Sequence, residues 1–222
     1  MIVKISILSI CLTAFFYFLL KEYTEINFLK KILTKIIGKE KIENVEDLIK
    51  IKNFLNNTIS YNSDLKTKKR PLLRHTSTEI LNSGYGFCGE NARVAIKLML
   101  LGGIKARRIY LFRKEWQHVL IEHEWKNKWY MFDGHYDKDT LLQDSQVASI
   151  PSENIENFPN NYPNNPYLDF CSIKLFQKIT LLNPFSKIKI PIVFVYLMES
   201  PNLIKTIFAF IVLSVVCLLF LT

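Results

Sequence analysis

The chain has 222 residues, a length that suits one domain with appendages. Its net charge of +9 would suit either nucleic acid or an anionic membrane surface. The sequence contains no recognisable nucleic-acid-binding module and its apolar residues crowd both ends, so we expect membrane lipid, and no nucleic acid, among its partners. Two of the four cysteines, Cys11 and Cys217, lie in the apolar terminal runs, which excludes a disulfide framework.

The N-terminal stretch from Ile5 to Leu20 is almost continuously apolar and lies between Lys4 and Lys21. Such a run could belong to a signal peptide, a spanning helix or a buried helix. The residues that follow it do not form the small-residue cleavage site of a signal peptide. With the flanking lysines extended towards the membrane surface, the run is long enough to span. We therefore favour an uncleaved membrane anchor over residues 1–21.

Amphipathic patterns follow the anchor. From Glu25 to Ile37, apolar residues share one face and lysines lie elsewhere, which fits a basic helix on anionic lipid or an ordinary domain helix equally well. Asn44 begins a capping box for a helix that continues to about Ile59. Thr76 begins a second capped helix, a short one, which leads into the central motif of the chain.

That central motif is the glycine-broken turn Ser83–Ala92, with the sequence SGYGFCGENA. It delivers Cys88 to the first turn of an amphipathic helix that extends to about Leu101, where Gly102 and the glycine after it end the pattern. Helix dipoles favour a thiolate at this end and lower the pKa of a thiol there. The alternative is a small buried core cysteine, the usual role of a free cysteine.

Two downstream segments are rich in aromatic and β-branched residues and are predicted to be strands, residues 116–122 and 128–134. Lys126 and Asn127 between them suit a hairpin turn, which would place His118 and Asp133 on neighbouring strands. A cysteine that faces a histidine oriented by a carboxylate is an activated nucleophile. His135 is a competing base, but it lies beyond Asp133 and lacks the strand context.

The order and spacing of these residues resemble the transglutaminase-like (papain-like cysteine protease) superfamily. The matching blocks are GxCxExA, GIxAR, HxxxE and WxxxD, and they cover about Thr76 to Tyr136. In this chain they are Gly86-Phe87-Cys88-Gly89-Glu90-Asn91-Ala92, Gly103-Ile104 with Ala106-Arg107, His118 with Glu122, and Trp129 with Asp133.

The sequence departs from the family pattern at two places. Leu120 stands where the family often has tryptophan, and Gly134-His135 follows the aspartate where proline is usual. Neither departure removes a member of the Cys88, His118 and Asp133 triad that the resemblance implies. The arylamine acetyltransferases share the Cys, His, Asp order and a CxExN run, but the rest of their larger fold has no counterpart here.

The predicted fold class is α+β, with a transglutaminase-like core in which the nucleophile helix packs on an antiparallel sheet. Ala106–Arg113 and the hairpin supply at least three strands of that sheet. No CxxC, HxxxH or carboxylate cluster predicts a metal, and we expect no cofactor.

The C-terminal part changes character twice. Ser152–Phe170 is rich in Asn and Pro and is interpreted as an irregular loop. Ile188–Met198 is apolar but contains Pro191, which favours a strand or an interfacial segment, whereas Leu203–Leu221 is long and apolar enough to span a membrane. The expected organisation is an anchor at 1–21, a catalytic domain at 22–170 with its motif core at 76–136, a juxtamembrane segment at 171–202 and a spanning helix at 203–222.

Two spans would put both termini on one side of the membrane and the domain on the other. Lysines flank the spans from inside the chain, which favours a cytoplasmic domain by the positive-inside rule.

These features predict a membrane-anchored thiol enzyme that forms a thioester from an amide or ester of an unidentified peptide, protein or acylated substrate. Hydrolysis by a protease or amidase is favoured over cross-linking, because water needs no second binding site. The backbone N–H of Cys88 is the expected first oxyanion donor, with Asn82 or a side chain near Trp116 as the second. The alternatives are a non-catalytic module that binds a peptide or glycan, and a structural membrane protein in which Cys88 and His118 are core residues.

Overall fold

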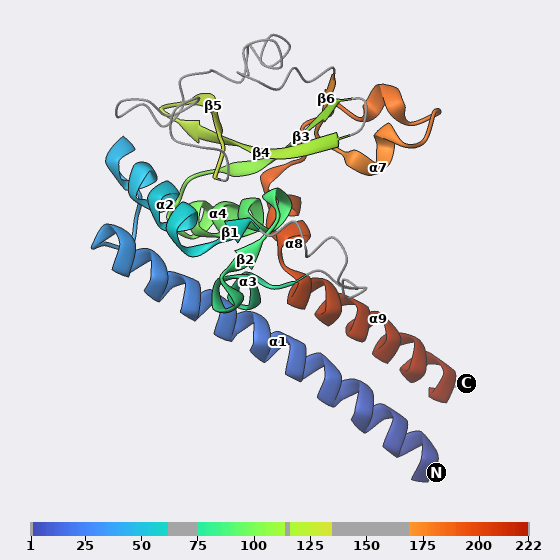
Figure 1. The fold of residues 1–222 in the computed structure, drawn as a ribbon. Coiled ribbons are helices and arrows are strands. Elements are labelled where there is room, and N and C mark those ends of the chain that lie inside the picture. Colours follow the sequence, from blue (N-terminus) through green and yellow to red (C-terminus); the bar gives the residue numbers. More distant parts are fainter. Residues whose placement is uncertain (1, 62–74, 114–115, 135–168, 222) are drawn as a thin grey trace.

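The computed structural model describes residues 2–61, 75–113, 116–134 and 169–221 (Figure 1). It contains a four-stranded antiparallel sheet with the strand order β5-β4-β3-β6. The strands are β3 (Ala106–Arg113), β4 (Trp116–Trp125), β5 (Lys128–Phe132) and β6 (Asp169–Cys171). The α+β class is therefore confirmed. His135 and most of the segment interpreted as a loop lie outside the described residues.

The predicted hairpin joins β4 to β5. Lys126 and Asn127 form its turn with φ angles of 48° and 64°, the left-handed conformation that a two-residue hairpin turn requires. Strand β6 was not predicted: Asp169 and Phe170 were assigned to the loop, but they pair with Phe112 and Leu111 of β3. Three residues at a sheet edge carry too short an alternation to be detected in an Asn- and Pro-rich region.

Helices cover one face of the sheet (Figure 1). The nucleophile helix α4 (Cys88–Leu101) packs on β3 and β4, and α2 (Val45–Thr58) and α3 (Ser77–Ser83) pack around it. Both expected capping boxes are present, at Asn44 and Thr76. The short strands β1 (Ser60–Tyr61) and β2 (Tyr85–Gly86) form a parallel pair just before α4.

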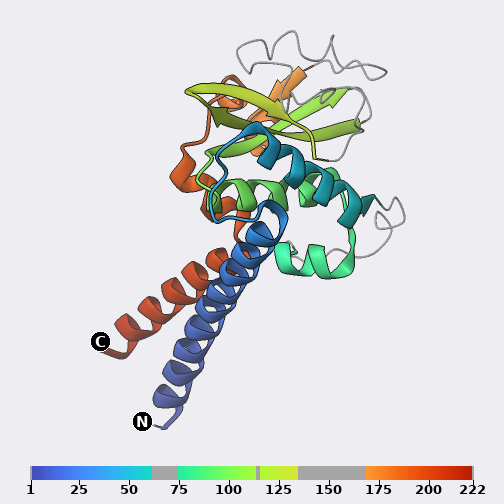
Figure 2. The same cartoon turned by 90° about the vertical axis from the view of Figure 1, so that its left-hand side faces the viewer.

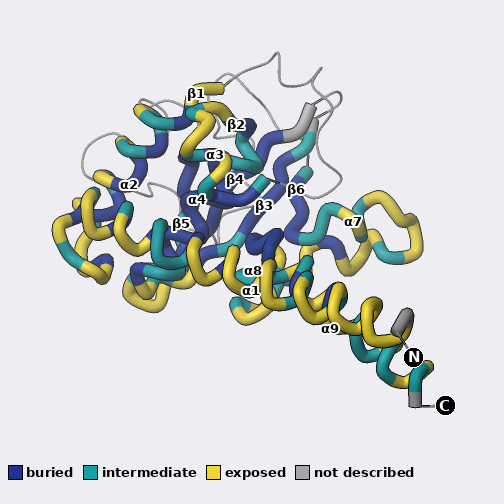
Figure 3. The backbone as a smooth tube through the Cα atoms, turned by 90° about the horizontal axis from the view of Figure 1, so that it is seen from below, coloured by how far each residue is buried: buried dark blue, intermediate teal, exposed yellow. Residues whose placement is uncertain are grey.

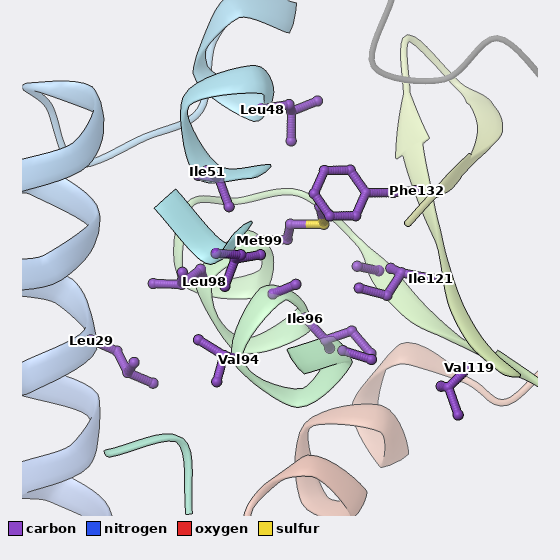
Figure 4. Packing of buried hydrophobic residues seen from close by; sticks show 14 of the residues in the cluster. Leu29, Leu48, Ile51, Val94, Ile96, Leu98, Met99, Val119, Ile121 and Phe132 are labelled. Carbon is purple, nitrogen blue, oxygen red and sulfur yellow. The ribbon is translucent and has the colours of Figure 1, made fainter. Parts of the chain in front are cut away.

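The hydrophobic core lies between α4 and the sheet and extends to α2 and α1 (Figure 4). Ile121 and Phe132 from the sheet meet Ile96 and Met99 from α4, and all four are almost completely buried. Burying each such side chain contributes about 1.5–3 kcal/mol. This packing fixes the height of α4 above β4, and with it the position of its first residue.

The N-terminal residues form one continuous helix, α1 (Ile2–Ile37), rather than an anchor and a separate amphipathic helix. The physical reason is that residues 2–37 contain neither glycine nor proline, so nothing interrupts the backbone hydrogen bonds. Leu29, Leu33 and Ile37 are buried in the core, so the second half is an ordinary domain helix. The first half extends away from the domain and leaves large apolar side chains exposed (Figure 3).

The C-terminal helix α9 (Pro201–Leu221) lies antiparallel beside the first half of α1, and the two termini lie close together (Figures 1 and 2). Phe15 packs on Phe210, with ring centroids 6.0 Å apart, and Lys4 lies over the Phe220 ring. Both helices are long and apolar enough to cross a membrane. Only 6% and 11% of their most apolar windows are buried, unlike the core helix of a soluble protein.

Between the sheet and α9, the chain forms three short helices. They are α7 (Lys174–Gln177), the 3-10 helix η3 (Asn183–Phe185) and α8 (Ile192–Glu199). The strand alternative for Ile188–Met198 is wrong for residues 192–198, which are helical, whereas the interfacial alternative stays a prediction. Pro191 does not interrupt that segment but precedes the first turn of α8, where its fixed φ and missing N–H are tolerated.

Helix α4 also carries a buried cation. Lys97 lies on the face that the sequence separates from the apolar one, yet it is fully buried, with its Nζ 3.1 Å from a carboxylate oxygen of both Glu22 and Glu25. Tyr196 donates to Glu22 at 2.8 Å and Asn202 donates to Glu25 at 3.1 Å. This cluster therefore joins α4 to α1, α8 and α9.

Lys97→Gln should destabilise the protein by about 3–5 kcal/mol, the usual cost of breaking a buried ion pair, because it leaves two carboxylates without their cation. The thermal unfolding midpoint of the full chain in detergent measures the effect. Lys31→Gln, the same change at an exposed position of α1, is the matched control and should shift the midpoint little. Equal midpoints for both variants and the parent would show that the cluster does not hold α4 in place.

Candidate active site

Cys88 is the first residue of α4, as the glycine-broken turn predicts. The helix begins there because Glu90 reaches back and accepts the backbone N–H of Phe87 at 2.9 Å. The other oxygen of the Glu90 carboxylate lies 2.8 Å from Nδ1 of His75. The glutamate of the GxCxExA block thus fixes the start of the helix, and with it the place of the thiol.

His118 and Asp133 come together at one end of the hairpin. His118 lies on β4 and Asp133 directly follows the last residue of β5. Nε2 of His118 is 2.7 Å from Oδ2 of Asp133, and both side chains are 1% exposed. The carboxylate therefore holds one ring nitrogen, and Nδ1 remains for a second partner.

The thiol of Cys88 is hydrogen-bonded to the side chain of His118 and to the backbone N–H of Val119. The sheet explains why that N–H is free. Glu124 donates its N–H to Lys105 on the β3 side, so by alternation Val119 directs its own N–H to the β5 side. Strand β5 pairs with β4 only from Ile121 onward, and the sulfur therefore occupies the place that the departing strand leaves open.

These contacts move the pKa values of the cysteine and the histidine in opposite directions. Burial alone would raise the pKa of Cys88, but the hydrogen bond and charge of His118, with the Val119 N–H, lower it below its ordinary value. Burial alone would lower the pKa of His118, but the Asp133 charge and hydrogen bond, with Cys88, raise it to about 10. The two shifts therefore both favour the thiolate–imidazolium form of the pair over the thiol–imidazole form.

Asn91, one turn after Cys88, is a site residue that the sequence analysis did not single out. Its Nδ2 donates to the carbonyl of Gly134 at 2.9 Å, and it is 1% exposed. A Cβ at position 134 would overlap the side-chain oxygen of Asn91, which explains a glycine immediately after Asp133. Asn91 stands at a variable position of the GxCxExA block, so the motif gave no signal for it, and only the structure shows that it ties the aspartate loop to α4.

The structure gives no contact between the thiol and the other candidates among the described residues. Asn82 is exposed on α3, and the side chain of Trp116 lies outside the described residues. His123 lies on the opposite face of β4, as its odd separation from His118 predicts, and burial lowers its pKa to about 4. No group of three or more metal-ligating side chains occurs among the described residues.

The fold and this site define an α+β protein with a thiol, an imidazole and a carboxylate at one end of a helix–hairpin junction. A family model described as the transglutaminase-like superfamily matches residues 30–134. Taken with the order of the motif blocks, this match shows that the protein contains a transglutaminase-like domain.

Similarity to solved structures and to curated proteins is weak. A solved structure described as the crystal structure of a TGase aligns with 59% of this chain and 35% of its own length, at 11% identity and a TM-score of 0.39. This chain thus spans about a third of that protein, and a similarity this low carries no argument about function. No curated protein matches the sequence significantly.

Gly134→Ala should disturb the site, because the added methyl group meets the Asn91 side chain and displaces Asp133. We expect slower alkylation of Cys88 by iodoacetamide at neutral pH, measured by mass spectrometry of the Cys88 peptide. Asn91→Ala removes both the hydrogen bond and the overlap. In that background the glycine change should therefore have a smaller effect, and an equal effect in both backgrounds would show that the two residues are not coupled.

Proposed function

We propose that the protein is a membrane-anchored thiol enzyme in which Cys88 is the nucleophile, His118 the general base and acid, and Asp133 the group that orients His118. The observation that carries this proposal is the continuous chain of hydrogen bonds from thiol to imidazole to buried carboxylate. Members of the transglutaminase-like superfamily are generally cysteine-dependent enzymes, and that class agrees with the chemistry of the three groups.

The proposed reaction has two halves. The thiolate attacks the carbonyl carbon of an amide or ester, the carbonyl π electrons move to its oxygen, and a tetrahedral oxyanion forms. The oxyanion collapses to a thioester as the amine or alcohol leaves with a proton from His118. Water or an amine then gives its proton to His118, attacks the thioester and releases the Cys88 thiolate, which leaves the imidazolium and thiolate as they began.

The beginning of α4 offers a first oxyanion donor. The N–H of Cys88 lies in the first turn of α4, where backbone N–H groups have no carbonyl partner within the helix. Hydrolysis needs only water as the acceptor, so we favour it over transamidation. The substrate class stays at an acylated compound, a peptide or a protein, because the contacts of the described residues select none of these.

The second candidate is a transglutaminase-like module that binds a peptide or glycan without turnover. Nothing in the geometry favours it, because binding alone does not require a buried carboxylate 2.7 Å from the histidine that contacts the thiol. A module that had lost catalysis would be free to lose any of the three groups.

Membrane anchoring is the second half of the proposal. It is supported by the two long apolar helices with exposed side chains and by their antiparallel packing. Residues 170–198 contain four lysines and no acidic residue, a composition suited to anionic lipid headgroups. We place the catalytic domain on the cytoplasmic side by the positive-inside rule.

Replacement of the triad residues tests the enzyme. His118→Ala should raise the pKa of the Cys88 thiol towards its ordinary value of about 8.5 or above, because the hydrogen bond and charge of His118 are lost while burial and the Asp133 charge remain. The pH dependence of the rate of Cys88 alkylation measures this pKa. His123→Gln, on the opposite face of the same strand, is the control and should titrate like the parent.

Turnover should follow the same pattern. With an electrophilic ester or amide probe, Cys88→Ala and Cys88→Ser should be inactive, since serine is far harder to deprotonate than cysteine. Asp133→Asn should retain a small fraction of the activity, because it loses the charge that stabilises the imidazolium. A parent thiol that titrates like His118→Ala would refute the catalytic pair.

A membrane wash tests the anchoring. The full chain should remain in the membrane fraction after extraction with alkaline carbonate and should be released only by detergent, because two apolar helices resist transfer to water. A peripheral protein expressed in the same cells is the control that carbonate must release. Appearance of the full chain in the carbonate supernatant would contradict spanning helices.

A further inference from the structure

Arg108 and Glu199 form a buried ion pair beside the nucleophile helix. Arg108 lies on β3, and Glu199 is the last residue of α8, immediately before the C-terminal spanning helix. Nε and Nη2 of Arg108 both donate to the carboxylate of Glu199, the second at 2.6 Å. The contact is therefore a bidentate ion pair. The side chains are 8% and 2% exposed.

The third nitrogen of the same guanidinium points at the beginning of α4. Nη1 of Arg108 would lie 3.1 Å from a Cβ placed on Gly89, the residue next to Cys88. The side chain of Val119 lies against the same point, at 3.7 Å, and its backbone N–H contacts the thiol. Any larger residue at position 89 would press on this nitrogen, so the glycine admits a positive charge next to the nucleophile.

Arg108 is not the arginine of the GIxAR block. That arginine is Arg107, whose side chain leaves the opposite face of β3. It pairs with Glu122 and its guanidinium lies 4.0 Å from the centre of the Trp129 ring. The family motif therefore gives Arg108 no role.

We propose that Arg108, held in place by Glu199, is a positioning residue whose charge stabilises the thiolate of Cys88. The inference rests on the proposed function, since it assumes that the thiolate is the working form. Because Glu199 occupies one edge of the guanidinium, the ion pair is oriented with its positive end towards the N-terminus of α4. It acts there in the same direction as the helix dipole.

The other charged groups around the thiol set the background for this effect. His118 and Asp133 form one pair beside the thiol, and Tyr110, on the same strand as Arg108, acts on the charge of that arginine. Burial opposes the charge on Arg108, but Glu199, Tyr110 and Cys88 together raise its pKa above its ordinary value. Arg108 therefore stays positive at every pH at which the thiol titrates.

Glu199 serves a second arginine as well. Nε of Arg93, on α4, lies 3.4 Å from the same carboxylate, and Arg93 is 2% exposed. Both arginines lie within residues 30–134, which the family model matches, whereas Glu199 lies beyond them. The segment before the C-terminal spanning helix thus provides the counter-charge for two buried cations of the catalytic domain.

Charge-removing and charge-keeping substitutions of Arg108 separate this role from a merely structural one. The measurement is the rate of Cys88 alkylation by iodoacetamide against pH, on the full chain in detergent. Arg108→Gln should raise the thiol pKa by about one unit, which slows alkylation about tenfold at a pH below both pKa values. Arg108→Lys loses the bidentate contact but keeps the positive charge. The pKa of its Cys88 thiol should therefore be close to that of the parent.

A structural role gives a different result. In that case Arg108→Lys and Arg108→Gln would both lower the thermal midpoint while the thiol pKa stayed at the parent value in each, and the proposal would be overturned. Arg107→Gln, the same change on the other face of β3, is the matched control and should leave the thiol pKa unchanged. Should Arg108→Gln fail to fold, Glu199→Gln replaces it.

Glu199→Gln keeps the arginine and removes its counter-charge. The proposal expects a thiol pKa below that of the parent, because the glutamine can still accept from the guanidinium but no longer offsets its charge, and an unchanged or raised value would overturn it. The two variants His118→Ala and Arg108→Gln distinguish a failure of this inference from a failure of the proposed function. If Cys88 and His118 are not a pair, His118→Ala leaves the thiol pKa unchanged; if only the present inference is wrong, His118→Ala raises it and Arg108→Gln does not.

Discussion

The structure depends on burying the charged side chains of helix α4. Helix α4 packs its apolar side on the sheet, but Arg93 and Lys97 on other faces are just as buried. A buried cation is tolerated only with a close counter-charge, and the carboxylates come from α1 and α8, far away in the sequence. Helix α4 can therefore take its place only when the chain segments next to both apolar helices have docked on it.

The site lies where strand β5 ends and no longer pairs with β4. Beyond the pair of Ile121 and Phe132, no strand among the described residues pairs with this edge of β4, and the N–H of Val119 is directed towards it. The thiol of Cys88 fills that position, and the chain leaving β5 brings Asp133 to His118. A longer β5 would pair with residues 118–120 and exclude the sulfur, so the short strand is part of the chemistry.

The sequence was sufficient for the parts of the fold that rest on local signals. The start of α4, the hairpin turn and the order of Cys88, His118 and Asp133 each leave a pattern within a few residues, and the structure brings those three side chains together. The continuity of α1 was readable but missed, because a change from apolar to amphipathic composition looks like a boundary although nothing breaks the helix. Strand β6 and the partners of Arg93 could not be found, since each depends on a residue far away in the chain.

Charge balance explains why those distant partners matter for the chemistry. The match to the transglutaminase-like superfamily at residues 30–134 includes Arg93, Arg108 and Lys97 but not their carboxylate partners Glu199, Glu22 and Glu25. Burial of these three cations costs desolvation free energy, which opposes the packing of α4 unless carboxylates lie close by. The segments next to the two apolar helices cancel that cost, and one of them orients a guanidinium towards the thiol. The segments next to the two long apolar helices therefore supply the counter-charges close to Cys88, so a displacement of those helices would change the electrostatics at the thiol.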